Sequence, residues 1–101
     1  MQLDEAQPMP EGWVSHPNSQ DKFSRSLVVD HQPRDKMSRY AVAFSAKLRN
    51  DGAGWRWNIW YSVGSDRKHL ASGWKIYRLE AAEEADAALA GLAARYHMGV
   101  L

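Results

Sequence analysis

Two alternating segments on either side of a glycine-rich turn constrain this chain more than any other feature. In Arg39–Arg49, and again in Trp55–Val63, every second residue is apolar. Side chains alternate between the two faces of a strand, so each segment predicts a half-buried β-strand. The intervening Asn50–Gly54 is rich in residues that tolerate positive φ and predicts a tight turn. The two segments are therefore expected to pair as an antiparallel hairpin.

Shorter patterns extend this hairpin in both directions. The β-branched run Arg25–Asp30 predicts a strand before it, and His69–Leu79 predicts a strand after it. The polar residues His31–Lys36 are expected to connect the first two strands. Glu80–His97 repeats alanine and leucine at helical spacing, with acids in its first turns and Gly99 just beyond its end. Those features predict a C-terminal helix.

Together these elements predict an α+β fold. We expect a four-stranded antiparallel meander with one C-terminal helix packed on one face, in the order ββββα. Three prolines disfavour helix in residues 1–20, which are expected to form an irregular acidic arm. Trp13 is the expected anchor of this arm on the body of the protein. Residues 21–101 are expected to form a single domain.

The residue types present argue against catalysis. The chain has 101 residues with no cysteine, which excludes disulfides and thiolate chemistry, and its four histidines lack the helical spacing of a zinc site. The acids Glu83, Glu84 and Asp86 are expected to form a solvated helix face. Gly52–Gly54 lies between two predicted strands, which is the wrong context for a phosphate-binding loop. We expect a non-enzymatic protein with no catalytic residue, metal or cofactor.

Two further features bear on location. No apolar run approaches the ~20 residues that a membrane-spanning helix needs. The first residues, Met1–Glu5, have neither the basic nor the apolar stretch of a secretory signal. A cytoplasmic protein that does not contact membranes is therefore expected.

The charged residues are segregated along the chain. Residues 1–20 carry a formal charge of −3, residues 21–79 carry twelve Lys or Arg and five Asp for +7, and residues 80–101 carry −3. The sum is the net charge of +1. A basic middle between two acidic ends bears on the partners of the protein and not on its fold.

The predicted strands gather cationic and aromatic side chains on one face. If Trp55 and Trp57 point toward the helix, the residues of opposite parity point away from it. With Trp74 and Ile76 also assigned to the core, the last strand adds two members to that face. The expected partner-binding residues are Arg39, Lys47, Arg49, Arg56, Trp60, Lys75 and Tyr77. Exposing Trp60 forgoes about 1.5–3 kcal/mol of burial, so we expect something to cover it.

The sequence suggests three groups that would cover Trp60 and this face of the sheet. The acidic arm could fold over it, with Trp13 stacked near Trp60. A protein partner or complex could dock there, because Trp, Tyr and Arg dominate interface hot spots, and a homodimer is one such case. Single-stranded nucleic acid is the alternative partner, since bases stack on aromatic rings while cations meet phosphates. The two acidic ends would repel those phosphates, so a protein partner is preferred.

Gly54–Ile59, followed by Ala71–Trp74 and an alanine- and glutamate-rich helix, is similar in pattern to small accessory proteins of bacteria and their phages, CRISPR inhibitors among them. This resemblance implies an inhibitor or adaptor that docks on a host complex. The ββββα order also resembles single-strand-binding sheet folds, although architecture alone does not fix function. Neither resemblance transfers a functional residue to this chain.

Overall fold

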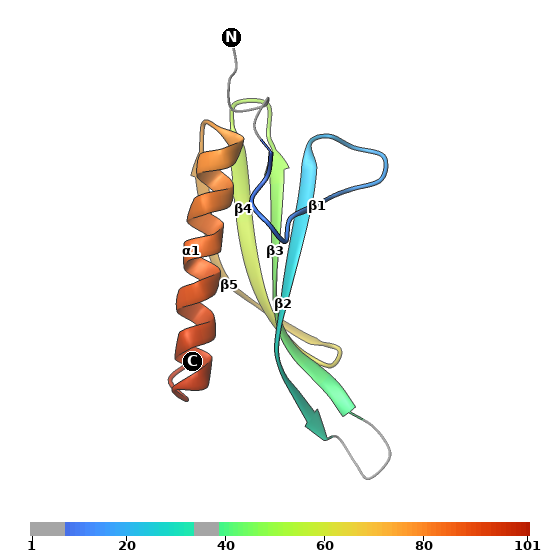
Figure 1. The fold of residues 1–101 in the computed structure, drawn as a ribbon, viewed down its shortest axis with the longest axis vertical. Coiled ribbons are helices and arrows are strands. Elements are labelled where there is room, and N and C mark those ends of the chain that lie inside the picture. The colour runs from blue at the N-terminus through green and yellow to red at the C-terminus, as the bar shows by residue number, and fades with distance from the viewer. Residues whose placement is uncertain (1–7, 34–38) are drawn as a thin grey trace.

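The computed structural model describes residues 8–33 and 39–101. It contains one antiparallel sheet whose strands follow each other in sequence order, and one helix (Figure 1). The elements are β1 (Val14–Ser15), β2 (Lys22–Pro33), β3 (Arg39–Asn50), β4 (Trp55–Val63), β5 (Asp66–Lys75) and α1 (Arg78–His97). The predicted α+β class is confirmed. The sheet has five strands rather than four, because the arm contributes the two-residue strand β1.

Strand β2 is longer than the sequence predicted. It starts at Lys22, opposite Arg49, and ends at Pro33, opposite Arg39. The twelve residues of β3 offer backbone partners over this whole length, and this pairing outweighs the polar character of the residues after Asp30. Part of the predicted connection between the first two strands therefore belongs to β2.

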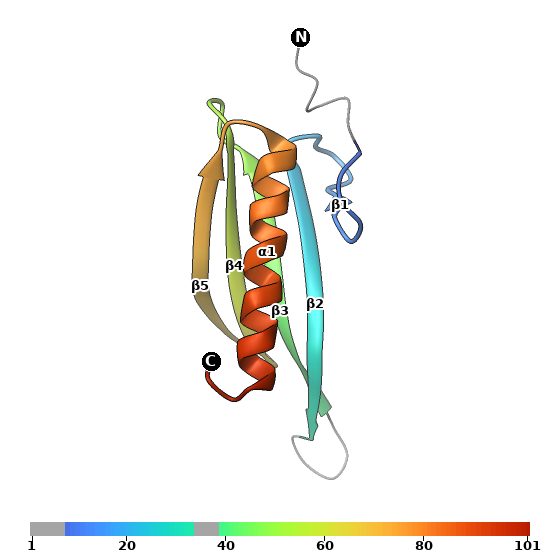
Figure 2. The same cartoon turned by 60° about the vertical axis from the view of Figure 1, so that its left-hand side comes forward.

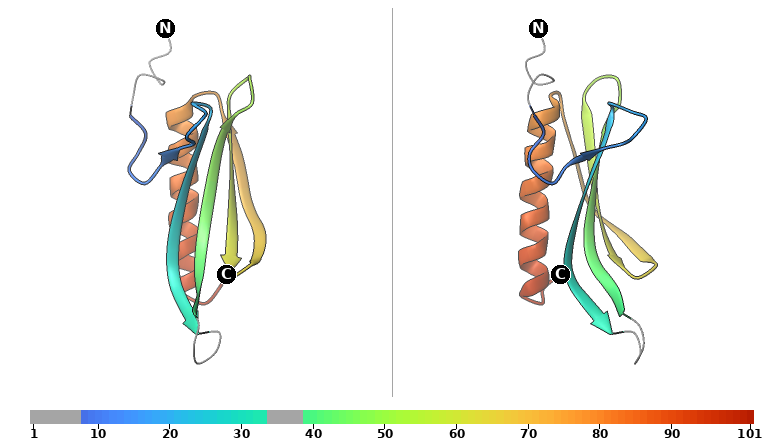
Figure 3. Two further views of the ribbon diagram at one scale, coloured as in Figure 1. Left: turned by 90° about the vertical axis from the view of Figure 1, so that its right-hand side faces the viewer. Right: turned by 45° about the vertical axis from the view of Figure 1, so that its right-hand side comes forward.

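The molecule has two layers. Helix α1 lies across one face of the sheet (Figure 2), and no helix of the described chain covers the other face (Figure 3). The core between the layers comes from one parity of β3 and β4 and one stripe of α1. Its members include Val42, Phe44, Ala46, Leu48, Trp55, Trp57, Ile59, Ala81, Ala82, Ala85 and Leu89. The alternation of the two central strands thus identified their buried face correctly.

Glu84 of α1 is half-buried and its carboxylate contacts the sheet. Its Oε1 accepts a hydrogen bond from the indole Nε1 of Trp57 at 2.8 Å. Its Oε2 lies 3.5 Å from Nζ of Lys75. A buried indole N–H needs an acceptor, and Glu84 supplies it across the layer interface. The predicted solvated face is therefore wrong for this acid.

The arm is anchored by Trp13, as predicted, but on the helix side of the sheet. Trp13 is buried, and its Nε1 donates to Oδ1 of Asp86 at 3.0 Å. The same oxygen lies 2.5 Å from Nη1 of Arg25 on β2. Asp86 thus faces the core side as well, and Trp13 does not stack near Trp60. Glu11 is exposed, and the arm's other two acids lie outside the described residues.

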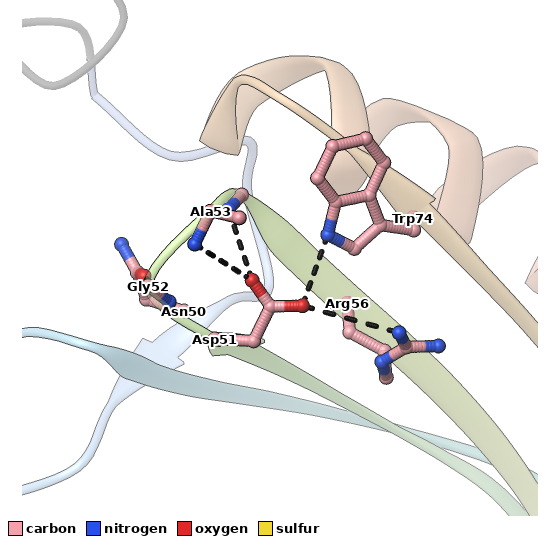
Figure 4. Close-up of polar contacts among 7 residues, drawn as sticks. Asn50, Asp51, Gly52, Ala53, Arg56 and Trp74 are labelled. Atoms are coloured by element: carbon pink, nitrogen blue, oxygen red, sulfur yellow. Dashed lines mark hydrogen bonds and ion pairs between the residues drawn. The ribbon is translucent and has the colours of Figure 1, made fainter.

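The β3–β4 turn is organised by one carboxylate (Figure 4). Oδ1 of Asp51 accepts hydrogen bonds from the backbone N–H groups of Ala53 at 3.0 Å and Gly54 at 2.9 Å. Oδ2 accepts from Nε1 of Trp74 at 3.0 Å and lies 3.9 Å from Nη2 of Arg56. These contacts, led by the Ala53 N–H, outweigh desolvation and hold the pKa of Asp51 below its ordinary value of 3.8.

The lowered pKa of Asp51 predicts a pH-dependent contribution to stability. Because the ionised form is favoured in the folded chain, the contribution is present above pH 3.8 and is lost as the pH falls through the lowered pKa. Thermal unfolding of Asp51→Asn should therefore show a lower Tm than the native chain at pH 7, with the two values converging in acid. A gap that stays constant between pH 7 and pH 2 would contradict this role. Asp66→Asn, at the start of β5, is the control.

Candidate functional site on the open face of the sheet

The surface turned away from α1, called the open face below, carries the outward residues of β2, β3, β4 and β5. The strand register arranges them in four rows. The rows are Lys22, Arg49, Arg56 and Trp74; Ser24, Lys47, Asn58 and Ser72; Ser26, Ser45, Trp60 and His69; and Val28, Ala43, Ser62 and Arg67. Five of these positions are Lys or Arg, and none is Asp or Glu.

Four of the five cations of the open face converge on a pocket of about 300 Å³, called the basic groove below. The groove is lined by His16, Lys22, Phe23, Lys47, Leu48, Arg49, Arg56, Asn58 and Trp60. None of the described carboxylates lines it. The groove therefore has a cationic wall from three strands and an aromatic side chain at Trp60.

The first row places three like charges directly opposite one another. Lys22 pairs with Arg49, and Arg49 pairs with Arg56. Directly opposed side chains on antiparallel strands have Cβ atoms about 4.5–5.5 Å apart, and like charges in such pairs destabilise a sheet. Asp51 reduces the repulsion in this row near Arg56, because its Oδ2 lies 3.9 Å from Arg56 Nη2. A bound anion would relieve the centre of the row as well.

Trp60 is half-buried beneath its own neighbours. Cζ of Arg67 lies 4.3 Å from the centroid of the indole, and Nζ of Lys47 lies 5.7 Å from it. The ring of His69 meets the indole edge at a centroid distance of 5.7 Å. Cations stacked on an indole are attracted by the ring quadrupole, so the covering predicted for Trp60 comes partly from the open face itself.

The structure brings four of the seven predicted partner-binding residues together. Lys47, Arg49, Arg56 and Trp60 all lie on the open face and line the basic groove. Lys75 and Tyr77 lie elsewhere. The side chain of Arg39 falls outside the described residues.

The prediction was wrong for the end of β5. Trp74 pairs with Arg56 on the open face and is 39% exposed, so Lys75 points to the helix side, where it meets Glu84. Tyr77 follows the strand and occupies the N-cap position of α1. The physical reason is Gly73, which lies against the indole of Trp57 and fixes the core-facing parity of this strand end.

Four residues of the open face were missed from the sequence. Lys22 was missed because β2 begins three residues before the predicted strand, and Arg67 was missed because β5 begins at Asp66, ahead of the strand predicted from His69. His69 and Trp74 share the open face because β5 has a register shift opposite Ile59 and Trp60, which leaves Leu70 as an extra residue. A β-bulge reverses the parity of a strand without a clear sequence signal.

Comparison with protein-family models, with curated proteins and with solved structures finds no match for this chain. In the part of the chain that the structure describes, no group of three or more metal-ligating side chains gathers. No described helix is long and apolar enough to cross a membrane. The fold and the site define a small two-layer α+β protein with an open, basic and aromatic sheet face.

Neutralising the central member of the like-charge row should stabilise the protein. Arg49→Gln removes repulsion with both Lys22 and Arg56, so we expect a gain of about 0.5 kcal/mol at low ionic strength. Urea unfolding measures this, and the gain should shrink in about 1 M salt. Lys47→Gln is the matched control, because Lys47 directly opposes neutral residues in its row. An equal or larger gain for that control would contradict the importance of the row.

Proposed function

We propose that the protein is a small non-enzymatic binding protein, an adaptor or inhibitor, that docks its open face on an anionic surface of a macromolecular partner in the cytoplasm. The observation that carries this proposal is the segregation of charge between the two faces. Five cations lie on the open face without an opposing acid among its strand positions. Glu84 and Asp86 instead point into the interface between sheet and helix.

This placement supports binding rather than catalysis. His69 on the open face lies 3.0 Å from Oδ1 of Asn58, which is neither a nucleophile nor a carboxylate that would orient a general base. The remaining side chains of the face are cations, serines, small apolar groups and indoles. Such a surface supplies attraction and contact area.

An acidic protein or complex and single-stranded nucleic acid both supply the anions required. The sequence favoured a protein because both acidic ends would repel phosphates. In the folded chain that objection weakens for the helix, because two of its acids are paired with Arg25 and Lys75 on the far side of the sheet. A homodimer that joins two open faces is disfavoured, because it would oppose cations with cations.

Retention on a heparin column tests the proposal whichever of these partners the protein binds. Lys47→Glu/Arg56→Glu reverses two charges on the open face, and Lys68→Glu/Arg95→Glu makes the same net change on exposed residues elsewhere. We expect the first variant to elute at much lower salt than the second. If the two variants shift equally, retention follows net charge, and docking through the open face would be wrong.

A further inference from the structure

The basic groove points to a more specific ligand than the open face as a whole does. Its volume of about 300 Å³ lies at the lower end of the range of small-ligand sites. Its wall offers four cations, and Trp60 and the amide of Asn58 lie at the same site. The ligand that fits must combine negative charge with a planar group.

We propose that the basic groove binds a nucleotide unit of single-stranded nucleic acid, an inference that rests on the proposed docking function of the open face. The phosphates lie along Lys22, Arg49 and Arg56, where they relieve the like-charge row. The base stacks on the indole of Trp60, as bases do on aromatic side chains of single-strand-binding surfaces.

The alternative anion, a carboxylate from an acidic protein, fits the groove less completely. A carboxylate satisfies the cations but has no planar group for the indole. The stacking of Arg67 on Trp60 at 4.3 Å indicates that the ring accepts a planar partner on its face. A base in that place displaces the guanidinium of Arg67, which is then free to contact a phosphate of the next nucleotide.

Single strands are preferred to duplexes for a geometric reason. The bases of a duplex are stacked inside the helix, and an indole that lies in a sheet can contact only bases that are splayed out. The four rows of the open face run across β2 to β5, three strand spacings of about 4.8 Å. A single-stranded nucleic acid that lies along the first row thus contacts Lys22, Arg49 and Arg56 in succession.

Fluorescence anisotropy with a labelled oligonucleotide of about 20 nucleotides of single-stranded DNA tests this inference at about 50 mM salt and above. With four phosphates neutralised, log Kd should change with log salt with a slope of about 3, since single strands contribute roughly 0.7 per phosphate. Lys22→Gln/Arg56→Gln should weaken binding at least tenfold and lower the slope by about 1.4. Lys68→Gln/Arg95→Gln, with the same charge change, should stay within threefold of the native chain.

Three further measurements distinguish single-stranded nucleic acid from an acidic protein as the partner. Oligonucleotide binding should quench tryptophan fluorescence. Trp60→Leu should weaken binding and abolish most of that quenching, whereas Trp60→Phe should retain binding because it keeps a ring. A poly-glutamate peptide of similar length should compete poorly, and a duplex should bind at least tenfold more weakly. Absence of binding at the lowest salt concentration overturns the inference. Equal competition by poly-glutamate, with quenching unchanged in Trp60→Leu, also overturns it and points to an acidic protein, while heparin retention still tests the docking face separately.

Discussion

Gly73→Ala should lower the free energy of unfolding by about 3 kcal/mol, or the Tm by on the order of 15 °C. A Cβ at this position would lie 2.5 Å from Nε1 and Cε2 of Trp57 and 2.5 Å from Oε1 of Glu84. The indole cannot withdraw easily because it is buried, and the carboxylate can move aside only by giving up the hydrogen bond that it accepts from the indole. The added methyl group therefore overpacks the layer interface and breaks the hydrogen bond as well.

Gly91→Ala is the matched control, since it adds the same methyl group to the middle of α1. A Cβ there meets no atom within 4 Å. Alanine is a better helix former than glycine by about 0.5–1 kcal/mol, so this variant should be more stable than the native chain. Thermal unfolding of both variants checks the pair. Equal stabilities for the two would show that β5 does not approach Trp57 as closely as the structure indicates.

Trp13→Ala should cost about 3 kcal/mol, because it removes a buried ring from the edge of the core. It also deprives Asp86 of the indole N–H and exposes the ion pair between Asp86 and Arg25. Deletion of residues 1–20 should have an effect at least as large. Urea unfolding followed by tryptophan fluorescence measures both.

Trp13→Phe separates the two contributions of this side chain. It retains most of the apolar area and loses the hydrogen bond to Asp86, so the expected cost is about 1 kcal/mol. If the alanine variant unfolds at the same urea concentration as the native chain, the arm is not anchored as described. If phenylalanine and alanine are equally destabilising, the hydrogen bond and not the packing holds the arm.

The sequence predicted the central hairpin and the helix well, because their periodicity is long and uninterrupted. Alternation over β3 and β4 set the parity of Phe44 and Ile59, both fully buried, and placed Lys47 and Arg49 on the other face. The same reasoning failed at β5, where the extra residue Leu70 shifts the register. Periodicity can be read only while the strand stays regular.

Only part of the basic groove could be predicted. Alternation placed Lys47, Arg49, Arg56 and Trp60 on the open face, whereas the other members of the groove depend on pairing between strands. Lys22 joins the groove through its pairing with Arg49, and a single sequence reveals neither the first residue of β2 nor its register against β3. Likewise, the acids of α1 looked like a solvated face until Trp57 and Trp13 supplied their hydrogen-bond donors. Contacts between residues far apart in the sequence therefore determine which residues line the groove and how the acids of α1 are paired.

The indole N–H signals of the tryptophans report separately on the two faces of the sheet. Trp60 and Trp74 lie on the open face, whereas Trp13 and Trp57 donate to Asp86 and Glu84 on the helix side. A ¹⁵N–¹H correlation spectrum recorded while a single-stranded oligonucleotide or a heparin fragment is added should show the Trp60 signal moving while those of Trp13 and Trp57 stay in place. Movement of the Trp13 and Trp57 signals with Trp60 unchanged would contradict an open, basic sheet face as the binding surface.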